Sequence, residues 1–205
     1  TAAGSVTGYK NGETADFTVT GTITLVGGPV NNTYTLVFKG EEGATETATA
    51  VRSDYTIEAS LGTLTITQNE TELKIVSSTK SFGYTGEAQH DYVYTVTFGE
   101  ESYEVTATEE AAAVATLLNG DTVTITPAES AKITHVAETT VDNAYTAVVS
   151  NEAQYKTVTR ETGKLSVTPA TLTVTTGTAS KQYDGQPLTA AGSVTGYKNG
   201  ETADF

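Results

Sequence analysis

The first seventeen residues of the chain, Thr1 to Phe17, recur without a single substitution as Thr189 to Phe205. The two copies stand 188 positions apart (189 − 1). Identity over a run of this length does not arise by chance, so we interpret the chain as slightly more than one period of a tandem array. Such arrays are typical of repetitive extracellular polymers and stalks, and the pattern argues against an enzyme.

The charge of the chain is strongly acidic. It carries 25 acidic and 11 basic side chains, a formal net charge of −14. A charge of this sign repels nucleic acid and anionic membranes, so neither is expected as a partner. No apolar run approaches the roughly 20 residues that a membrane-spanning helix needs, which predicts no membrane insertion in this segment. The absence of cysteine excludes disulfides and thiolate chemistry.

Apolar and polar residues alternate in many short segments, which predicts strands with one buried face. The clearest segments are 92–98, 63–67 and 171–175. We therefore predict an all-β fold of tandem β-sandwich-like (Ig-like) units, stacked end to end in a rod. The alternative is an elongated, β-grasp-like sheet with one short helix at about 109–118. Thr108 would cap that helix, and Val114, Leu117 and Leu118 would form its apolar face.

One period contains two related units. Residues 72–86 align without gaps on residues 171–185, at an offset of 99 (171 − 72). Shorter pairs support the alignment: Asn32-Thr33-Tyr34-Thr35 with Asn143-Ala144-Tyr145-Thr146, 62–67 with 163–168, and Asn11-Gly12-Glu13 with Asn119-Gly120-Asp121. The expected domains are a unit A remainder at 1–71 without its opening strand, a complete unit B at 72–170, and the opening of the next unit A at 171–205.

The sequence also predicts how copies assemble. The expected junctions are short, for example Pro169-Ala170, which favours end-to-end stacking with little hinge freedom. A 1–71 segment without its first strand would expose a sheet edge. We therefore expect 171–188 of one chain to complete 1–71 of another, with Leu172 and Val174 in the assembly strand. Residues 1–17 and 189–205 should share one structure only if both copies find their partner strands.

Two neighbouring segments, 181–188 and 194–201, together resemble the YDG and MBG repeats. The first of them contains Tyr183-Asp184-Gly185. These repeats are modules of large bacterial cell-surface, adhesin-like proteins. Unit B departs from the pattern, because Tyr84-Thr85-Gly86 replaces Tyr-Asp-Gly. The resemblance implies an extracellular location at the bacterial cell surface, tandem stacking and a stalk or adhesive role. It supplies no catalytic residues.

No constellation in the sequence indicates chemistry. Tyr183, Asp184 and Gly185, like Tyr84 and Gly86, are interpreted as structural, since Asp-Gly suits a tight turn. The two histidines, His90 and His135, are too few for a zinc site, and we expect no metal, cofactor or catalytic residue.

Two functions remain open. The leading hypothesis is a non-catalytic structural module of a surface stalk or filament, whose partners are copies of itself. The alternative is an adhesin module that binds a host glycan or surface protein.

Overall fold

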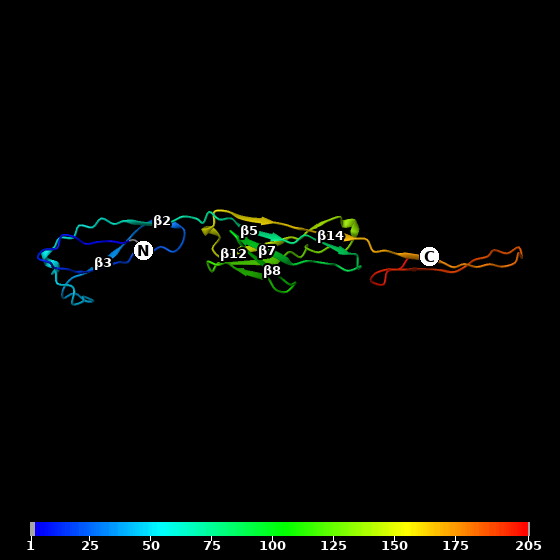
Figure 1. The fold of residues 1–205 in the computed structure, drawn as a ribbon, viewed down its shortest axis with the longest axis horizontal. Coiled ribbons are helices and arrows are strands. Elements are labelled where there is room, and N and C mark those ends of the chain that lie inside the picture. The colour runs from blue at the N-terminus through cyan, green and yellow to red at the C-terminus, as the bar shows by residue number, and fades with distance from the viewer. Residues whose placement is uncertain (1–2, 205) are drawn as a thin grey trace. The chain divides into compact units, whose positions relative to one another are not determined.

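The computed structural model describes residues 3–204. The chain forms two compact units, Thr1–Asn69 and Glu70–Phe205 (Figure 1). Nearly all regular structure is β-strand, which confirms the all-β prediction. Among residues 3–204, the helical residues lie in three single turns of 3-10 helix: η1 (Arg52–Asp54), η2 (Val136–Glu138) and η3 (Glu152–Gln154).

Two sheets form the main body of the second unit. Strands β5, β7 and β8 belong to the four-stranded sheet and are labelled in Figure 1. The four-stranded sheet has the order β13-β5-β7-β8, with β13 parallel to β5 and the other pairs antiparallel. The second sheet has the order β12-β10-β9 and is antiparallel throughout. The strands are β5 (Leu73–Ser77), β7 (Val93–Phe98), β8 (Glu101–Thr106), β13 (Val158–Glu161), β9 (Ala113–Thr116), β10 (Thr122–Pro127) and β12 (Tyr145–Val149).

The core of this unit lies between the two sheets. Leu73 and Ile75 of β5 alternate with half-exposed residues and are completely buried. Val123 and Ile125 of β10 belong to the same apolar cluster, as does Tyr94 of β7. Because each strand contributes every second residue, the two inner faces meet as in a β-sandwich.

A third sheet extends the second unit. Its order is β11-β14-β6, and β14 runs parallel to β6. A smaller cluster of Ile133, Leu165 and Val167 lies under it. Beyond β14, β15 pairs antiparallel with β16 in the orange-to-red segment of Figure 1. The bounds are β6 (Lys80–Gly83), β11 (Val141–Asp142), β14 (Lys164–Thr168), β15 (Thr173–Thr176) and β16 (Gly192–Thr195).

The described part of the first unit, from residue 3 onward, contains two strand pairs. β1 (Asp16–Val19) pairs with β3 (Tyr34–Val37), and β2 (Gly27–Asn31) pairs with β4 (Thr63–Ile66), both antiparallel. Its buried apolar residues are Phe38, Ala48 and Ala50. Hydrogen bonds from Thr45 and Thr47 to the Asp16 carboxylate hold the 45–47 loop, and the bond from the Thr45 amide is the main reason for the lowered pKa of Asp16.

The helix predicted at 109–118 is wrong. A turn closed by the Thr108 hydroxyl and the Ala111 amide precedes strand β9. Ala115 is 2% exposed, whereas Val114 is 52% exposed. The buried residues of this segment, Ala113, Ala115 and Leu117, repeat with a period of two rather than the helical spacing of Val114, Leu117 and Leu118. The small alanines allow β9 to lie against the core beside β10, and this pairing overrides their helix propensity.

The two copies of the duplicated segment differ in structure. Gly192–Thr195 forms β16 against β15, whereas the identical residues 4–7 are not in a strand. The turn that follows is the same in both, with φ values of 50° and 47° at Asn11 and Asn199. The backbone of the turn is therefore a local property of the sequence, while strand formation depends on the neighbour each copy finds.

Candidate functional site

Three Asn-Gly-acid turns are each held by a tyrosine hydroxyl. They are Asn11-Gly12-Glu13, Asn119-Gly120-Asp121 and Asn199-Gly200-Glu201. Their carboxylates accept hydrogen bonds from Tyr55, Tyr155 and Tyr84, respectively. Hydrogen bonds to ionised carboxylates are stronger than those between neutral groups, so the arrangement fixes the position of each turn.

Two of these contacts occupy equivalent places in the two units. Tyr55 directly follows η1 and Tyr155 directly follows η3, and each hydroxyl oxygen lies 2.5 Å from its carboxylate oxygen. Hydrogen bonding from Tyr155, followed by bonds from neighbouring amide and hydroxyl groups, lowers the pKa of Asp121. Burial and the bond to Asp121 raise the pKa of Tyr155. The contact therefore favours a charged acid and a neutral tyrosine.

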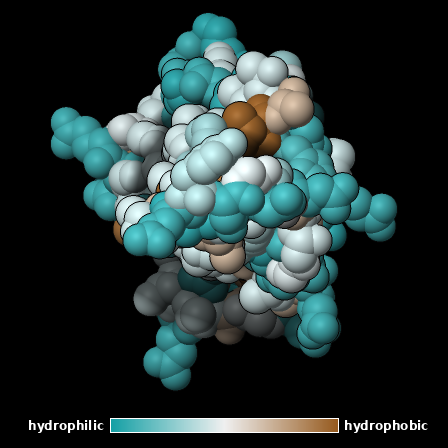
Figure 2. Space-filling view, turned by 90° about the vertical axis from the view of Figure 1, so that its right-hand side faces the viewer, coloured by the Kyte–Doolittle hydropathy of each residue, from teal (hydrophilic) through white to brown (hydrophobic). Residues whose placement is uncertain are grey.

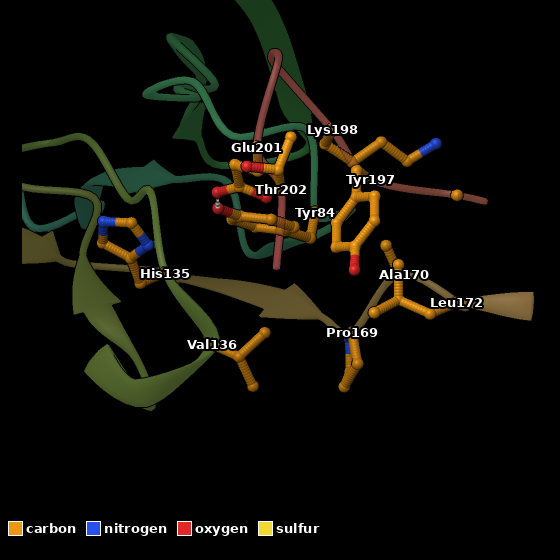
Figure 3. Close-up of a pocket in the computed structure, with 11 residues that line it drawn as sticks. Tyr84, His135, Val136, Pro169, Ala170, Leu172, Tyr197, Lys198, Glu201 and Thr202 are labelled. Carbon is orange, nitrogen blue, oxygen red and sulfur yellow. Dashed lines mark hydrogen bonds between the residues drawn. The ribbon is translucent and has the colours of Figure 1, made fainter. Parts of the chain in front are cut away.

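The third contact joins residues 199–201 of the repeated segment to the 84–86 loop, and Figure 3 shows the side chains of Tyr84 and Glu201. Tyr84 donates to Glu201, and this bond is the main cause of the raised pKa of Tyr84. Asn199 Nδ2 donates to the carbonyl oxygen of Gly86 at 3.0 Å. The ring of His135 lies 6.1 Å from the ring of Tyr84. We call these contacts the B–A joint, because they link residues 84–86 of unit B to residues 199–201 of the next unit A.

An open pocket of about 550 Å³ lies at the B–A joint. Its wall includes aromatic and aliphatic side chains, and Figure 3 shows those of Tyr84, Tyr197, Val136, Pro169 and Leu172. Glu201 supplies a carboxylate that already accepts from Tyr84, and Lys198 supplies a cation at the rim. This lining suits packing against a protein segment or a sugar ring.

The described part of the chain, residues 3–204, contains no group of three or more His, Asp or Glu side chains placed to hold a metal ion. His90 stacks on Tyr92 with ring centroids 4.1 Å apart. Lys74 and Lys80 each form an ion pair. The Nζ atom of Lys74 lies 2.7 Å from the carboxylate of Glu161, and the Nζ atom of Lys80 lies 2.7 Å from the carboxylate of Asp91.

The structure places the Tyr183-Asp184-Gly185 segment at the surface. Asp184 accepts from the Gln186 amide at 3.0 Å and from Lys181 at 2.8 Å, and Gly185 has a φ of 73°, as a tight turn requires. The side chain of Tyr183 is 97% exposed. Its counterpart Tyr84 is half-buried in the B–A joint. Leu172 and Val174 are 49% and 61% exposed.

Sequence reasoning missed the role of Asn143. This residue is completely buried, and its Nδ2 donates to the carbonyl oxygens of Ser78 and Asp91 at 3.0 and 2.7 Å. It thereby ties the turn between β5 and β6 to the residues before β7. Its conspicuous match to Asn32 in the internal repeat was an available signal, but the partners are backbone atoms more than fifty positions away.

Within residues 3–204, no helix is long and apolar enough to cross a membrane. The face drawn in Figure 2 is largely hydrophilic, with a small hydrophobic patch. Comparisons with protein-family models, curated proteins and solved structures find no match.

Proposed function

We propose that the chain is a non-catalytic structural module of a repetitive stalk or filament on the bacterial cell surface, whose copies assemble head to tail. The observation that carries the proposal is the B–A joint. It ties residues 199–201 of one unit A to residues 84–86 of the preceding unit B by hydrogen bonds from Tyr84 and Asn199. The connecting residues Pro169 and Ala170 line the pocket at this joint, with Pro169 exposed and Ala170 half-buried. A joint of this kind serves a spacer that must hold its units in series.

The exact duplication supports the same function. A polymer built of alternating units A and B repeats the same sequence in every A unit, and residues 189–205 repeat the sequence of residues 1–17. Differences between adjacent units limit misassembly between neighbours. The acidic surface of such a polymer, with a net charge of −14 per chain, opposes its aggregation.

Hydrogen exchange of the whole chain tests the joint. Replacement Tyr84→Phe removes the bond to Glu201, so exchange of amides 197–202 should accelerate by about threefold or more. Tyr183→Phe is the matched control, because Tyr183 aligns with Tyr84 but is exposed. Unchanged exchange in Tyr84→Phe contradicts an ordered joint.

Labelling of intact source cells by an antibody against the chain tests the proposed location at the cell surface. Labelling only after permeabilisation contradicts that location.

A second candidate is an adhesin module that binds a host glycan. The observation in its favour is the open pocket at the B–A joint, where Tyr84 and Tyr197 both lie in the wall. Aromatic rings commonly stack on the apolar faces of sugars. A glycan array probed with the whole chain and with Tyr197→Ala distinguishes the two candidates. Reproducible binding that the substitution abolishes supports the adhesin, and no binding supports the spacer.

A further inference from the structure

The turn at the B–A joint contains an asparagine followed by a glycine. Asn199 and Gly200 are its two central residues, and the Glu201 amide closes it by donating to the carbonyl oxygen of Lys198 at 2.9 Å. Both central residues have a positive φ, 47° and 75°, as in a type I′ turn. Both are also exposed to water. Figure 3 shows the flanking side chains, those of Lys198 and Glu201.

An Asn-Gly pair is chemically reactive, because a ring can close within the chain. The backbone nitrogen of the glycine loses its proton and attacks Cγ of the asparagine side chain. The bond between Cγ and Nδ2 then breaks, ammonia leaves, and a five-membered succinimide ring remains. Asparagine is therefore a thermolabile residue, and a following glycine favours the reaction because it has no Cβ atom to hinder the approach.

Two features of the structure leave Asn199 open to this ring closure. Within residues 3–204, the Gly200 N–H makes no hydrogen bond, so no bond must break before its nitrogen attacks. Among the same residues, the side-chain amide of Asn199 makes one hydrogen bond, from Nδ2 to the carbonyl oxygen of Gly86 at 3.0 Å. The nucleophile is thus free, and the side chain is held at a single atom.

The Asn119-Gly120 pair provides an internal contrast, because the same two residue types are held in place there. The Gly120 N–H donates to the carbonyl oxygen of Leu117 at 2.9 Å. The Asn119 amide is fixed at both of its atoms. Its Nδ2 donates to the Tyr155 hydroxyl at 2.7 Å and to Asp121 Oδ2 at 3.0 Å, and its Oδ1 accepts from the Asp121 amide at 3.1 Å. Ring closure at Asn119 therefore requires several hydrogen bonds to break first.

We propose that Asn199 is a site of self-modification, at which the chain converts asparagine to aspartate and isoaspartate with water as the only co-reactant. Water adds to one of the two carbonyl carbons of the succinimide. Addition at the side-chain carbonyl breaks its bond to the Gly200 nitrogen and gives aspartate. Addition at the main-chain carbonyl breaks the other bond to that nitrogen and gives isoaspartate, in which the chain runs through Cγ. In both cases one water is consumed and one ammonia is released.

The products cannot keep the contact with unit B. Asn199 Nδ2 is the donor to Gly86 O, and a carboxylate in its place sets an acceptor against an acceptor. The two residues are closely packed, since a Cβ atom built on Gly86 would lie 2.5 Å from Asn199 Cβ. The new charge also stands two positions from Glu201, whose carboxylate accepts from Tyr84. Conversion therefore releases the Asn199 contact of the B–A joint.

In the proposed spacer, this chemistry gives the B–A joint a limited lifetime. The loss of the joint rests on the proposed function, whereas the conversion of Asn199 rests only on the turn and its hydrogen bonds. A stalk or filament would accordingly become less stiff at its B–A joints as it ages, without any enzyme.

Incubation of the whole chain at mildly alkaline pH, followed by digestion and mass spectrometry, tests the proposal. Cleavage after lysine separates the identical segments, because Asn199 and Asn11 then begin peptides of different length. The Asn199 peptide should gain the mass difference between an amide and an acid, and part of the product should be isoaspartate. Asn119 should convert at least about tenfold more slowly. No conversion at Asn199, or equal rates at Asn199 and Asn119, overturns the proposal.

Hydrogen exchange of two variants tests the effect on the joint. Asn199→Asp carries the charge of the product from the start, so exchange of amides 197–202 should accelerate by about threefold or more. Asn119→Asp is the matched control, because it adds the same charge at the other Asn-Gly turn and should leave amides 197–202 unchanged. Exchange of these amides at the wild-type rate in Asn199→Asp overturns the release of the joint.

The outcomes separate this inference from the proposed function. A chain that keeps its Asn199 amide and protects amides 197–202 overturns self-modification and leaves the spacer standing. A freshly prepared chain without protection at these amides contradicts the ordered joint itself, and with it the proposed function.

Discussion

Replacement of Asn143 by alanine should strongly destabilise the second unit. The side chain is completely buried, and its Nδ2 lies 3.0 Å from Ser78 O, 3.1 Å from Ser78 Oγ and 2.7 Å from Asp91 O. Alanine leaves the Ser78 carbonyl without this donor, while Asp91 O keeps a weak 3.4 Å contact with Ser78 Oγ. A buried polar group left without its partner costs about 1–3 kcal/mol, so two weakened carbonyls give roughly 2–4 kcal/mol.

The assay is thermal unfolding followed by circular dichroism, together with hydrogen exchange of the amides in β5 and β7. For a unit of the size of Glu70–Phe205, 1 kcal/mol corresponds to a change of about 3–5 °C in the midpoint, so Asn143→Ala should lower it by roughly 6–20 °C. Amides of β5 should exchange faster, because Asn143 fixes the turn that follows this strand.

The matched control is Asn32→Ala, at the equivalent position of the first unit. Asn32 is only partly buried, and its side chain makes no counterpart of the Asn143 Nδ2 hydrogen bonds among residues 3–204, so this variant should change the stability of the monomeric chain by less than about 0.5 kcal/mol. A change of similar size in both variants, or a midpoint for Asn143→Ala within about 2 °C of wild type, would refute the reasoning.

Two further predictions concern the second unit. The pKa of Asp121 is lowered chiefly by the hydrogen bond from Tyr155, so its contribution to stability is present above its ordinary value of 3.8 and is lost as the pH falls through the lower folded pKa. Asp121→Asn should therefore lower the melting temperature at pH 7 and reduce the further loss at pH 2–3, and melts at both pH values check this. In β9, Ala115→Leu should cost about 1–3 kcal/mol by overpacking, whereas Val114→Thr should cost less than about 0.5 kcal/mol. Equal effects in denaturant titrations would contradict the strand periodicity.

The alternating segments were the most reliable guide to the fold. Residues 92–98, 63–67 and 171–175 alternate apolar and polar side chains, and strands occupy Val93–Phe98, Thr63–Ile66 and Thr173–Thr176. The segment 109–118 misled because Thr108 could cap a helix, and Val114 and the leucines were spaced as on a helix. Pairing of Ala115 with Val123 decided its conformation, and no local pattern contains that contact.

The candidate site was only partly visible in the sequence. The Asn-Gly-acid turns could be aligned, and the matching φ values at Asn11 and Asn199 show that their backbone is locally encoded. The tyrosines that hold them could not be assigned, because Glu13 and Glu201 belong to identical segments and yet accept from Tyr55 and Tyr84.

The sequence by itself determined the period, the all-β class, the acidic surface and the conformation of the tight turns, since these depend on composition and on neighbouring residues. Tertiary structure alone decided which strands pair, which amide is buried and which tyrosine meets which carboxylate. Asn143 and Ser78 lie 65 positions apart, and Tyr84 and Glu201 lie 117 positions apart. A hydrogen bond over such a separation forms only when the sheets bring both groups together, so identical segments acquire different structures from different surroundings.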